Sequence, residues 1–159
     1  MMKNPRFKEL LANPNHFFSF GFGSGLAPKA PGTFGTLAAV PIFWLIQDLS
    51  WPIYLSWLLV TFALGVLWCE RSSKALGVHD HGGIVWDEFV GYWITMFMAP
   101  KGWLWILIGF VLFRLFDIVK PWPINWLDKK VEGGFGIMID DVLAGIYALV
   151  CLQLLAHFI

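Results

Sequence analysis

Five acidic side chains in this sequence are grouped in a way that could bind a divalent cation. Asp87 and Glu88 are adjacent, Asp140 and Asp141 are adjacent, and Asp117 lies between the two pairs. Each pair precedes an apolar run, so capping of helix N-termini is the simplest structural explanation. One acid per helix would serve that purpose, whereas adjacent acids repel one another unless a cation lies among them. Because Mg²⁺ prefers carboxylate, water and phosphate oxygens, we interpret all five as candidate Mg²⁺ ligands.

Two basic side chains accompany Asp117 in the segment FRLFDIVKPWPI. Arg114, Asp117 and Lys120 follow one another at a spacing of three, which places them close to one face of a helix until Pro121 discourages further helix. One interpretation is structural, with basic side chains that reach the membrane interface and pair locally with Asp117. The other is functional, with Arg114 and Lys120 binding a phosphate while Asp117 helps to bind the metal. The residues alone leave both open.

A glycine- and proline-rich segment, GSGLAPKAPGTFGT at residues 23–36, resembles a phosphate-binding loop. Its glycines permit close approach of the backbone, Lys29 adds positive charge, and Thr33 could cap the following helix and leave N–H groups directed at an anion. The P-loop pattern GxxxxGK[ST] is absent, and a plain turn would explain the same composition. GGFG at residues 133–136 is similarly either a linker or a mobile cover over the site.

The remaining nucleophiles and metal ligands offer little support for other chemistry. His79, Asp80 and His81 form a short run that suits a solvated loop, and no second His or Cys cluster completes a zinc site. Cys69 and Cys151 lie in apolar runs and lack the C-x5-R pattern of cysteine phosphatases. The DxDx[TV] pattern of aspartyl-phosphate phosphatases is also absent. Metal-assisted attack by water is therefore favoured over a covalent intermediate.

The composition indicates an integral membrane protein. Of the 159 residues, 58% are hydrophobic and only 14% are charged, whereas soluble domains are about 25% charged. Lys and Arg together number 11, as do Asp and Glu, which excludes a basic nucleic-acid-binding protein. We expect a single domain over residues 1–159 with a polar N-terminal segment at residues 1–19.

Apolar runs at residues 35–47, 53–69, 89–99, 103–116 and 142–158 predict an all-α membrane bundle with about four to five membrane-embedded helices. Runs 35–47 and 89–99 are short for a full crossing. If consecutive runs pair as hairpins, every Lys and Arg except Lys101 falls on one side, together with residues 70–88 and 117–141. The positive-inside rule makes that side cytoplasmic, so the candidate site would lie in cytoplasmic loops.

Four motifs together resemble the phosphatidylglycerophosphatase A family, a family of bacterial inner-membrane lipid phosphatases. They are FGSGLAPKAPGTFGT, GVHDHGGIVWDEFVGYW, FRLFDIVKPWPI and GGFGIMIDDVLAG, and the resemblance covers roughly residues 20–145. It implies Mg²⁺-dependent hydrolysis of phosphatidylglycerophosphate to phosphatidylglycerol and phosphate, a step of phospholipid biosynthesis. The motif positions that it implies as functional are Asp87, Glu88, Arg114, Asp117, Lys120, Asp140 and Asp141.

Motif and residue chemistry together predict two overlapping sets of site residues. The catalytic set is Asp87, Glu88, Asp117, Lys120, Asp140 and Asp141, and the phosphate-binding set is Lys29, Thr33, Arg114 and Lys120. A phospholipid substrate and the bilayer are the expected partners. The alternative is a small transporter or channel subunit with a cation site, but transport would favour acids near the middle of the bilayer. A phosphotransferase of the CDP-alcohol type is disfavoured because its motif is absent.

Overall fold

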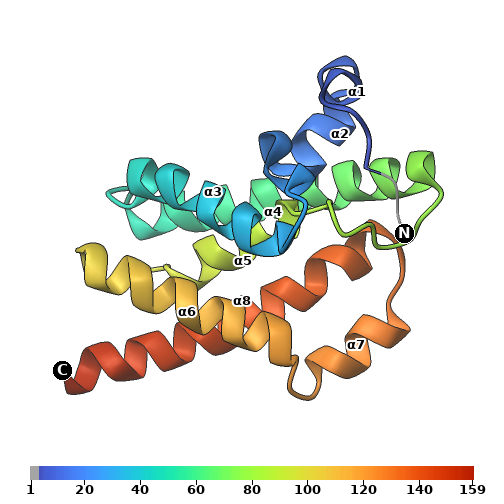
Figure 1. Cartoon of the computed structure of the whole chain (residues 1–159). Helices are drawn as coiled ribbons and strands as arrows, with labels where there is room; N and C mark the ends of the chain where they lie inside the picture. The colour runs from blue at the N-terminus through green and yellow to red at the C-terminus, as the bar shows by residue number, and fades with distance from the viewer. Residues whose placement is uncertain (1–3) are drawn as a thin grey trace.

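The computed structural model describes residues 4–159, and its regular elements are helical (Figure 1). Within that range no strand occurs, which confirms the predicted all-α class. The elements are α1 (Phe7–Ala12), α2 (Pro14–Ser19), a 3₁₀ segment η1 (Gly21–Leu26), α3 (Pro31–Ile46), α4 (Trp51–Leu76), α5 (Trp86–Thr95), α6 (Trp103–Val119), α7 (Ile124–Lys130) and α8 (Gly133–Phe158).

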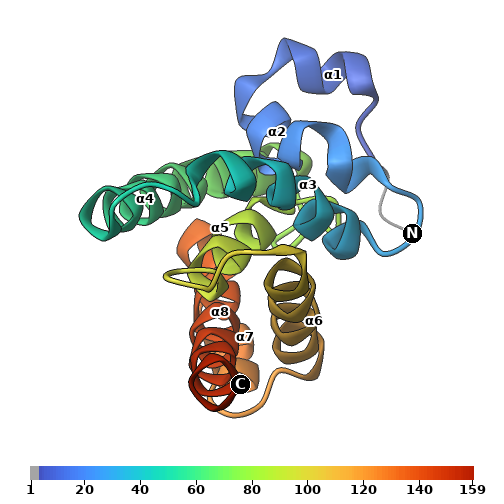
Figure 2. The same ribbon diagram turned by 90° about the vertical axis from the view of Figure 1, so that its left-hand side faces the viewer.

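The short helix α5 lies at the centre of the molecule, where it packs against α3, α4, α6 and α8 (Figure 2). Most of its side chains are buried, so it has no broad exposed face. Three of them donate hydrogen bonds to backbone carbonyls of the neighbouring helices: Trp86 Nε1 to Thr61 of α4 (3.0 Å), Trp93 Nε1 to Ala39 of α3 (3.1 Å) and the Tyr92 hydroxyl to Ile106 of α6 (3.1 Å). These bonds fix the rotation of α5, and therefore the direction of the acids in its first turn.

Two glycines allow the backbones of α5 and α8 to approach closely. A Cβ atom on Gly91 of α5 would lie only 2.8 Å from the carbonyl oxygen of Asp141 in α8. Likewise, a Cβ atom on Gly145 of α8 would lie 2.5 Å from the carbonyl oxygen of Gly91. Small residues at a helix crossing permit such contact, as they do in membrane bundles. The crossing brings Asp141 next to the first turn of α5.

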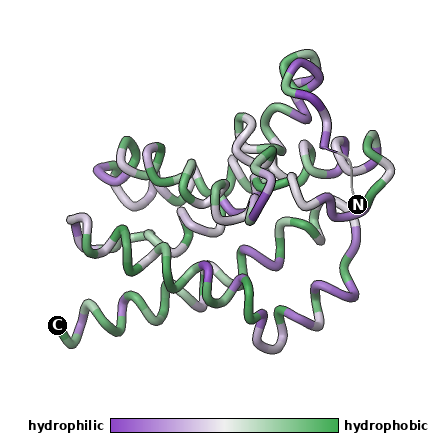
Figure 3. The backbone as a smooth tube through the Cα atoms, viewed as in Figure 1, coloured by the Kyte–Doolittle hydropathy of each residue, from purple (hydrophilic) through white to green (hydrophobic). Residues whose placement is uncertain are grey.

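The helices differ in whether they are long enough to cross a membrane. Among the described residues, α4 and α8 have 26 residues each and are the two that are apolar and long enough. Helices α3, α5 and α6 have 16, 10 and 17 residues, short of the roughly 20 needed for a crossing. The structure thus supports two candidate spans, fewer than the four to five embedded helices predicted. Figure 3 shows apolar residues along α6 and the C-terminal part of α8, and more polar residues around α7.

Two local predictions about helix boundaries are wrong. Gly133 and Gly134 open α8, so GGFG is neither a linker nor a loop covering the site. The Gly134 N–H donates a hydrogen bond to the Glu70 carboxylate of α4, which satisfies a helix-terminal donor from outside the helix. Ala30 is the N-cap of α3, so Thr33 lies inside the first turn and does not cap the helix.

Candidate active site

A polar cavity of about 170 Å³ gathers the acids predicted from the sequence. Its walls come from the start of α3, the loop before α5, the first turn of α5, the end of α6 and the N-terminal part of α8. The residues that line it are Gly32, Asp80, His81, Gly82, Ile84, Asp87, Glu88, Asp117, Lys120, Ile137, Asp140 and Asp141. All five acids of the predicted metal-ligand set therefore face one cavity, although they come from three different helices.

The positions of these acids exclude helix capping as a common explanation. Asp87 and Glu88 do lie in the first turn of α5. Asp140 and Asp141 lie well inside α8, which begins at Gly133 and has no acid in its first turn. Asp117 lies near the C-terminus of α6, where the helix dipole opposes a negative charge. Capping therefore accounts for one pair at most.

Three of the acids form what we call the inner cluster: Asp87, Glu88 and Asp141. One carboxylate oxygen from each lies within 4.8 Å of the others. In the described part of the chain, Asp87 Oδ1 and Asp141 Oδ2 are buried and have no hydrogen-bond partner. Leaving buried carboxylate oxygens unpaired is costly, and a hard divalent cation such as Mg²⁺ would remove that cost. The donor set of the inner cluster therefore fits Mg²⁺.

The pKa shifts of the two acids of α5 also favour a bound cation. Burial raises the pKa of Asp87 well above its usual value, and the negative charge of Asp141 raises it further. Burial also raises the pKa of Glu88, with additional contributions from Asp117 and Asp87, although the Arg114 guanidinium opposes them. These shifts show that the protein's own basic groups do not neutralise the cluster. A bound cation would stabilise the ionised carboxylates.

Arg114 holds two of the acids together. Its Nη1 atom donates to Glu88 Oε2 at 2.9 Å and also to the Asp117 carboxylate, and its side chain is only 15% exposed. The Nη1 atom is thus engaged by carboxylates, whereas the buried Nε atom has no hydrogen-bond partner among the described residues, and the phosphate-binding role of Arg114 stays a prediction. A Cβ atom on Gly32 would lie 2.7 Å from Glu88 Oε1, so the glycine-rich segment reaches the site at this residue.

Lys120 is the more accessible cation of the cavity. It ends α6 in a left-handed conformation (φ 50°), and its side chain is 31% exposed. Its Nζ atom lies 3.8 Å from Asp117 Oδ1 and 3.9 Å from Asp140 Oδ2. Burial lowers the pKa of Lys120, but the carboxylates of Asp141, Asp117 and Asp140 outweigh it and raise the pKa overall. Lys120 is therefore charged and available at the edge of the cavity.

The sequence-based site and the structural site differ in several residues. Lys29 is exposed and, like Thr33, is not among the residues that line the cavity, so their phosphate-binding role stays a prediction. Gly32, Asp80 and His81 do line it and were not in the predicted set. His81 Nδ1 accepts a hydrogen bond from the Gly83 N–H at 2.9 Å. His81 therefore helps to hold the loop before α5. Proximity to the acidic motif was the one sequence feature pointing to Asp80.

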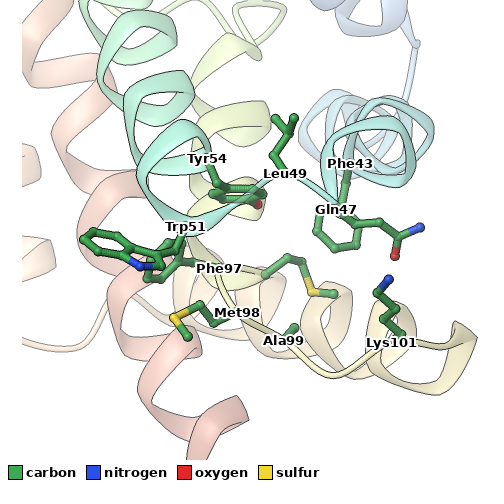
Figure 4. Close-up of a pocket in the computed structure, with 10 residues that line it drawn as sticks. Phe43, Gln47, Leu49, Trp51, Tyr54, Phe97, Met98, Ala99 and Lys101 are labelled. Carbon is green, nitrogen blue, oxygen red and sulfur yellow. The ribbon is translucent and has the colours of Figure 1, made fainter.

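A second, larger cavity of about 310 Å³ lies at the other end of α5 (Figure 4). The turn between α3 and α4 and the segment between α5 and α6 form it. Figure 4 shows Trp51, Tyr54 and Phe97 on one side and Phe43, Gln47 and Lys101 on the other. This cavity has aromatic and thioether walls with one lysine, and none of the residues that line it in the described part of the chain is acidic.

Comparison with known proteins gives consistent matches over nearly the whole chain. Residues 17–156 match the family model described as phosphatidylglycerophosphatase A. A phosphatidylglycerophosphatase A of Haemophilus influenzae strain Rd is 51% identical, with 92% of this chain and 91% of the relative aligned. The phosphatidylglycerophosphatase A of Escherichia coli strain K12 is 46% identical, with 96% and 93% aligned.

A further relative, from Bacteroides thetaiotaomicron, is 38% identical over 94% of each chain. It is provisionally named as a phosphatidylinositol-3-phosphatase, which is a different lipid phosphatase activity. No solved structure matches the chain.

Proposed function

The chain belongs to the phosphatidylglycerophosphatase A family, and we propose that it hydrolyses the terminal phosphate of phosphatidylglycerophosphate to give phosphatidylglycerol and inorganic phosphate. This makes it a phosphoric monoester hydrolase of phospholipid biosynthesis. The observation that carries the proposal for the site is the inner cluster, in which one carboxylate oxygen from each of three acids lies within 4.8 Å of the others and two oxygens of these acids are buried without a partner among the described residues.

We propose that α4 and α8 cross the bacterial inner membrane and that the acid-lined cavity opens toward the cytoplasm. In α8, residues 142–158 carry no Asp, Glu, Lys or Arg and extend for about 25 Å at 1.5 Å per residue. Asp140 and Asp141 directly precede this stretch, so they would lie where the hydrocarbon begins. Exposed apolar side chains such as Leu59 (64%), Leu107 (59%) and Leu154 (54%) would contact lipid. The headgroup phosphate would then reach the acids while the acyl chains stay in the bilayer.

We assign Mg²⁺ to the inner cluster, held by Asp87, Glu88 and Asp141. When bound, it would supply positive charge for the phosphate oxygens and lower the pKa of a coordinated water. Asp117 supports this set through its ion pair with Arg114, which also holds Glu88. Arg114 is therefore a positioning residue in this proposal, because both acids depend on it for their placement.

Lys120 is the residue that we assign to the substrate phosphate. Its ammonium group is partly exposed at the edge of the cavity and is not committed to a short ion pair, since its distances to Asp117 and Asp140 are 3.8 and 3.9 Å. Reorientation toward a phosphate oxygen would therefore break no close contact. A positive charge at this position would stabilise the negative charge that develops on the phosphoryl oxygens.

The test is phosphate release by the purified protein from phosphatidylglycerophosphate in mixed micelles. We expect release with Mg²⁺, loss of release after exhaustive treatment with EDTA, and recovery when Mg²⁺ is restored. Phosphatidic acid and phosphatidylinositol 3-phosphate, tested in parallel, would report headgroup selectivity. Release that survives complete chelation would contradict the metal assignment, and absence of release from every lipid would contradict the proposed activity.

A further inference from the structure

The N-terminal part of the described chain exposes several large apolar side chains. Residues 4–26 contain α1, α2 and η1, which together we call the N-terminal arm. The arm lies at one edge of the molecule, next to α4 and away from α6 and α8 (Figures 1 and 2). Three of its side chains are exposed: Phe7 (52%), Leu11 (61%) and Phe22 (41%). Exposed apolar side chains that lie together mark a surface for a membrane or for another protein.

These three side chains form one surface, which we call the apolar patch. Phe7 and Leu11 are four residues apart in α1, so they share one face of the helix. The fully buried Leu10 attaches α1 to the rest of the protein and leaves that face outward. The Phe7 ring lies 3.2 Å from the position that a Cβ atom on Gly23 would occupy, and Gly23 directly follows Phe22. The apolar patch therefore combines α1 with η1.

The apolar patch continues onto α4, a helix that we propose to cross the membrane. The ring centroids of Phe22 and Phe18 are 5.8 Å apart, and Phe18 stacks on Trp68 of α4 at 4.3 Å. Trp68 lies near the end of the uncharged part of α4, residues 51–69, which stops at Glu70. With α4 across the membrane, Trp68 and the apolar patch lie where the span meets water. Aromatic side chains are enriched at this level of a membrane protein.

Basic side chains accompany the apolar patch. Arg6 and Lys8 are exposed and flank Phe7, and residues 4–26 contain one acid, Glu9, whose carboxylate lies 3.6 Å from Arg6. Exposed apolar side chains beside Lys and Arg are typical of helices that lie in the plane of a membrane surface, and the basic groups attract anionic lipids. A protein partner would not require the patch to lie level with the end of a membrane span. The position of the patch therefore favours a lipid surface.

We propose that the N-terminal arm lies on the cytoplasmic surface of the membrane, where the apolar patch inserts between phospholipid headgroups and Arg6 and Lys8 interact with anionic headgroups. The inference rests on the proposed function, because it requires α4 to cross the membrane. Helix α1 has only six residues, so its insertion is shallow and adds to the anchoring by α4 and α8 without replacing it.

The N-terminal arm is also attached to the candidate active site. The backbone N–H of Val85, the N-cap of α5, donates a hydrogen bond to the Ser19 carbonyl at 2.8 Å. The backbones of Gly25 and Gly83 are in close contact, because a Cβ atom on Gly83 would lie 2.9 Å from the Gly25 carbonyl oxygen. Residues of this loop before α5 line the acid cavity. An arm held at the membrane surface would therefore keep the cavity at the level of the lipid headgroups.

The experiment is site-directed spin labelling of the full-length protein in vesicles of phosphatidylglycerol and phosphatidylethanolamine. Single cysteines are introduced in a background with Cys69→Ala and Cys151→Ala, and each is labelled with a nitroxide. Collisions with molecular oxygen, which partitions into the bilayer, and with a water-soluble nickel chelate then report the surroundings of each label. Circular dichroism of each labelled variant verifies that the helical fold is retained.

We expect labels at Phe7→Cys, Leu11→Cys and Phe22→Cys to show an oxygen-to-nickel accessibility ratio about 3-fold or more above that of a label at Ala12→Cys. Ala12 is the matched control, because it is exposed on α1 but points about 100° away from Leu11. In vesicles of phosphatidylcholine alone, the ratio at Phe7→Cys should fall about 2-fold, since the basic side chains of the arm lose their anionic partners.

A label at Leu59→Cys, on the exposed face of α4, separates this inference from the proposed function. Lipid exposure at Leu59→Cys together with water exposure at all three patch positions would overturn the inference and leave the crossing of α4 standing. Patch labels that neither reagent reaches would indicate a protein contact and would overturn it as well. Water exposure at Leu59→Cys would contradict the crossing of α4, and the inference with it. An unchanged ratio in phosphatidylcholine vesicles would contradict the role of Arg6 and Lys8.

Discussion

A cavity lies at each end of α5, one with aromatic walls and one lined by carboxylates. The smaller of the two is the candidate active site. At the far end, the cavity of about 310 Å³ has aromatic walls, and the nearby ion pair between Lys101 and Asp48 is exposed, at 74% and 68% of the side chains. At the acid end, the cavity of about 170 Å³ is lined by carboxylates, and Arg114 and Glu88 are only 15% and 11% exposed. The larger of these two cavities is therefore not the one that gathers the carboxylates.

The difference between the ends lies in how their charges are compensated. The far-end pair has one acid and one base in water, so solvent screening makes it worth little. At the acid end, buried carboxylates outnumber basic side chains, and three of their oxygens have no partner among the described residues. Folding tolerates such an arrangement at a cost in stability, which indicates that it is retained for binding. Matched substitutions at the two ends can test this contrast.

The largest effect should come from the inner cluster. Asp141→Asn removes a charge from three carboxylates that lie within 4.8 Å of one another, and we expect turnover to fall about 10²-fold or more because cation binding weakens. Asp87→Asn should act similarly, whereas Asp48→Asn at the far end should leave turnover within about 2-fold. Phosphate release at saturating Mg²⁺ measures all three. Near-normal turnover in both cavity variants would assign these acids a structural role.

Lysines at the two ends should also differ. Lys120→Ala removes the accessible cation of the acid cavity, and we expect turnover to fall about 30- to 1,000-fold, equivalent to about 2–4 kcal/mol of transition-state stabilisation. Lys120→Arg should recover only part of this loss, because a planar guanidinium does not reproduce a compact ammonium. Lys101→Ala should leave the rate unchanged. If both Lys120 variants match wild type at saturating Mg²⁺, Lys120 serves only as an interfacial anchor.

A smaller effect should follow from separating α5 and α8. Gly91→Ala places a methyl group 2.8 Å from the Asp141 carbonyl, so the helices must move apart. We expect a loss of about 1–3 kcal/mol in stability and a decrease in turnover, since the inner cluster spans this crossing. Gly82→Ala is the matched control for stability alone, because a Cβ atom there meets nothing within 4 Å but Gly82 also lines the acid cavity. Thermal unfolding in detergent and phosphate release would be measured together, and equal stability of the two variants would contradict the close-packing argument.

The smallest effect should appear at the far end. The buried Tyr54 hydroxyl donates a hydrogen bond to the Trp93 carbonyl at 2.5 Å, so Tyr54→Phe should cost about 1 kcal/mol of stability. Turnover should remain within about 2-fold of wild type, because this bond lies near the aromatic cavity rather than the acids. A large loss of turnover without a loss of stability would show that the far end takes part in the reaction.

The acidic motifs and the helical class could be predicted from the sequence because they depend on local information. Apolar runs indicate helices, and adjacent carboxylates on the same side of the predicted topology indicate a cation site. The predicted acids Asp87, Glu88, Asp117, Asp140 and Asp141 do line one cavity. The ends of helices were harder to predict from the sequence. Helix α8 begins at Gly133, which places its acidic pair in the helix interior.

The tertiary structure alone decided which partner each charge has. Helical spacing put Arg114 near Asp117, but its second carboxylate, Glu88, comes from another helix. Lys120 at the end of α6 lies 3.9 Å from Asp140 of α8, and no local pattern in the sequence indicates that proximity. The physical reason is that composition and periodicity specify a helix and its apolar face, whereas the rotation and separation of helices depend on packing contacts such as Gly91 against Gly145.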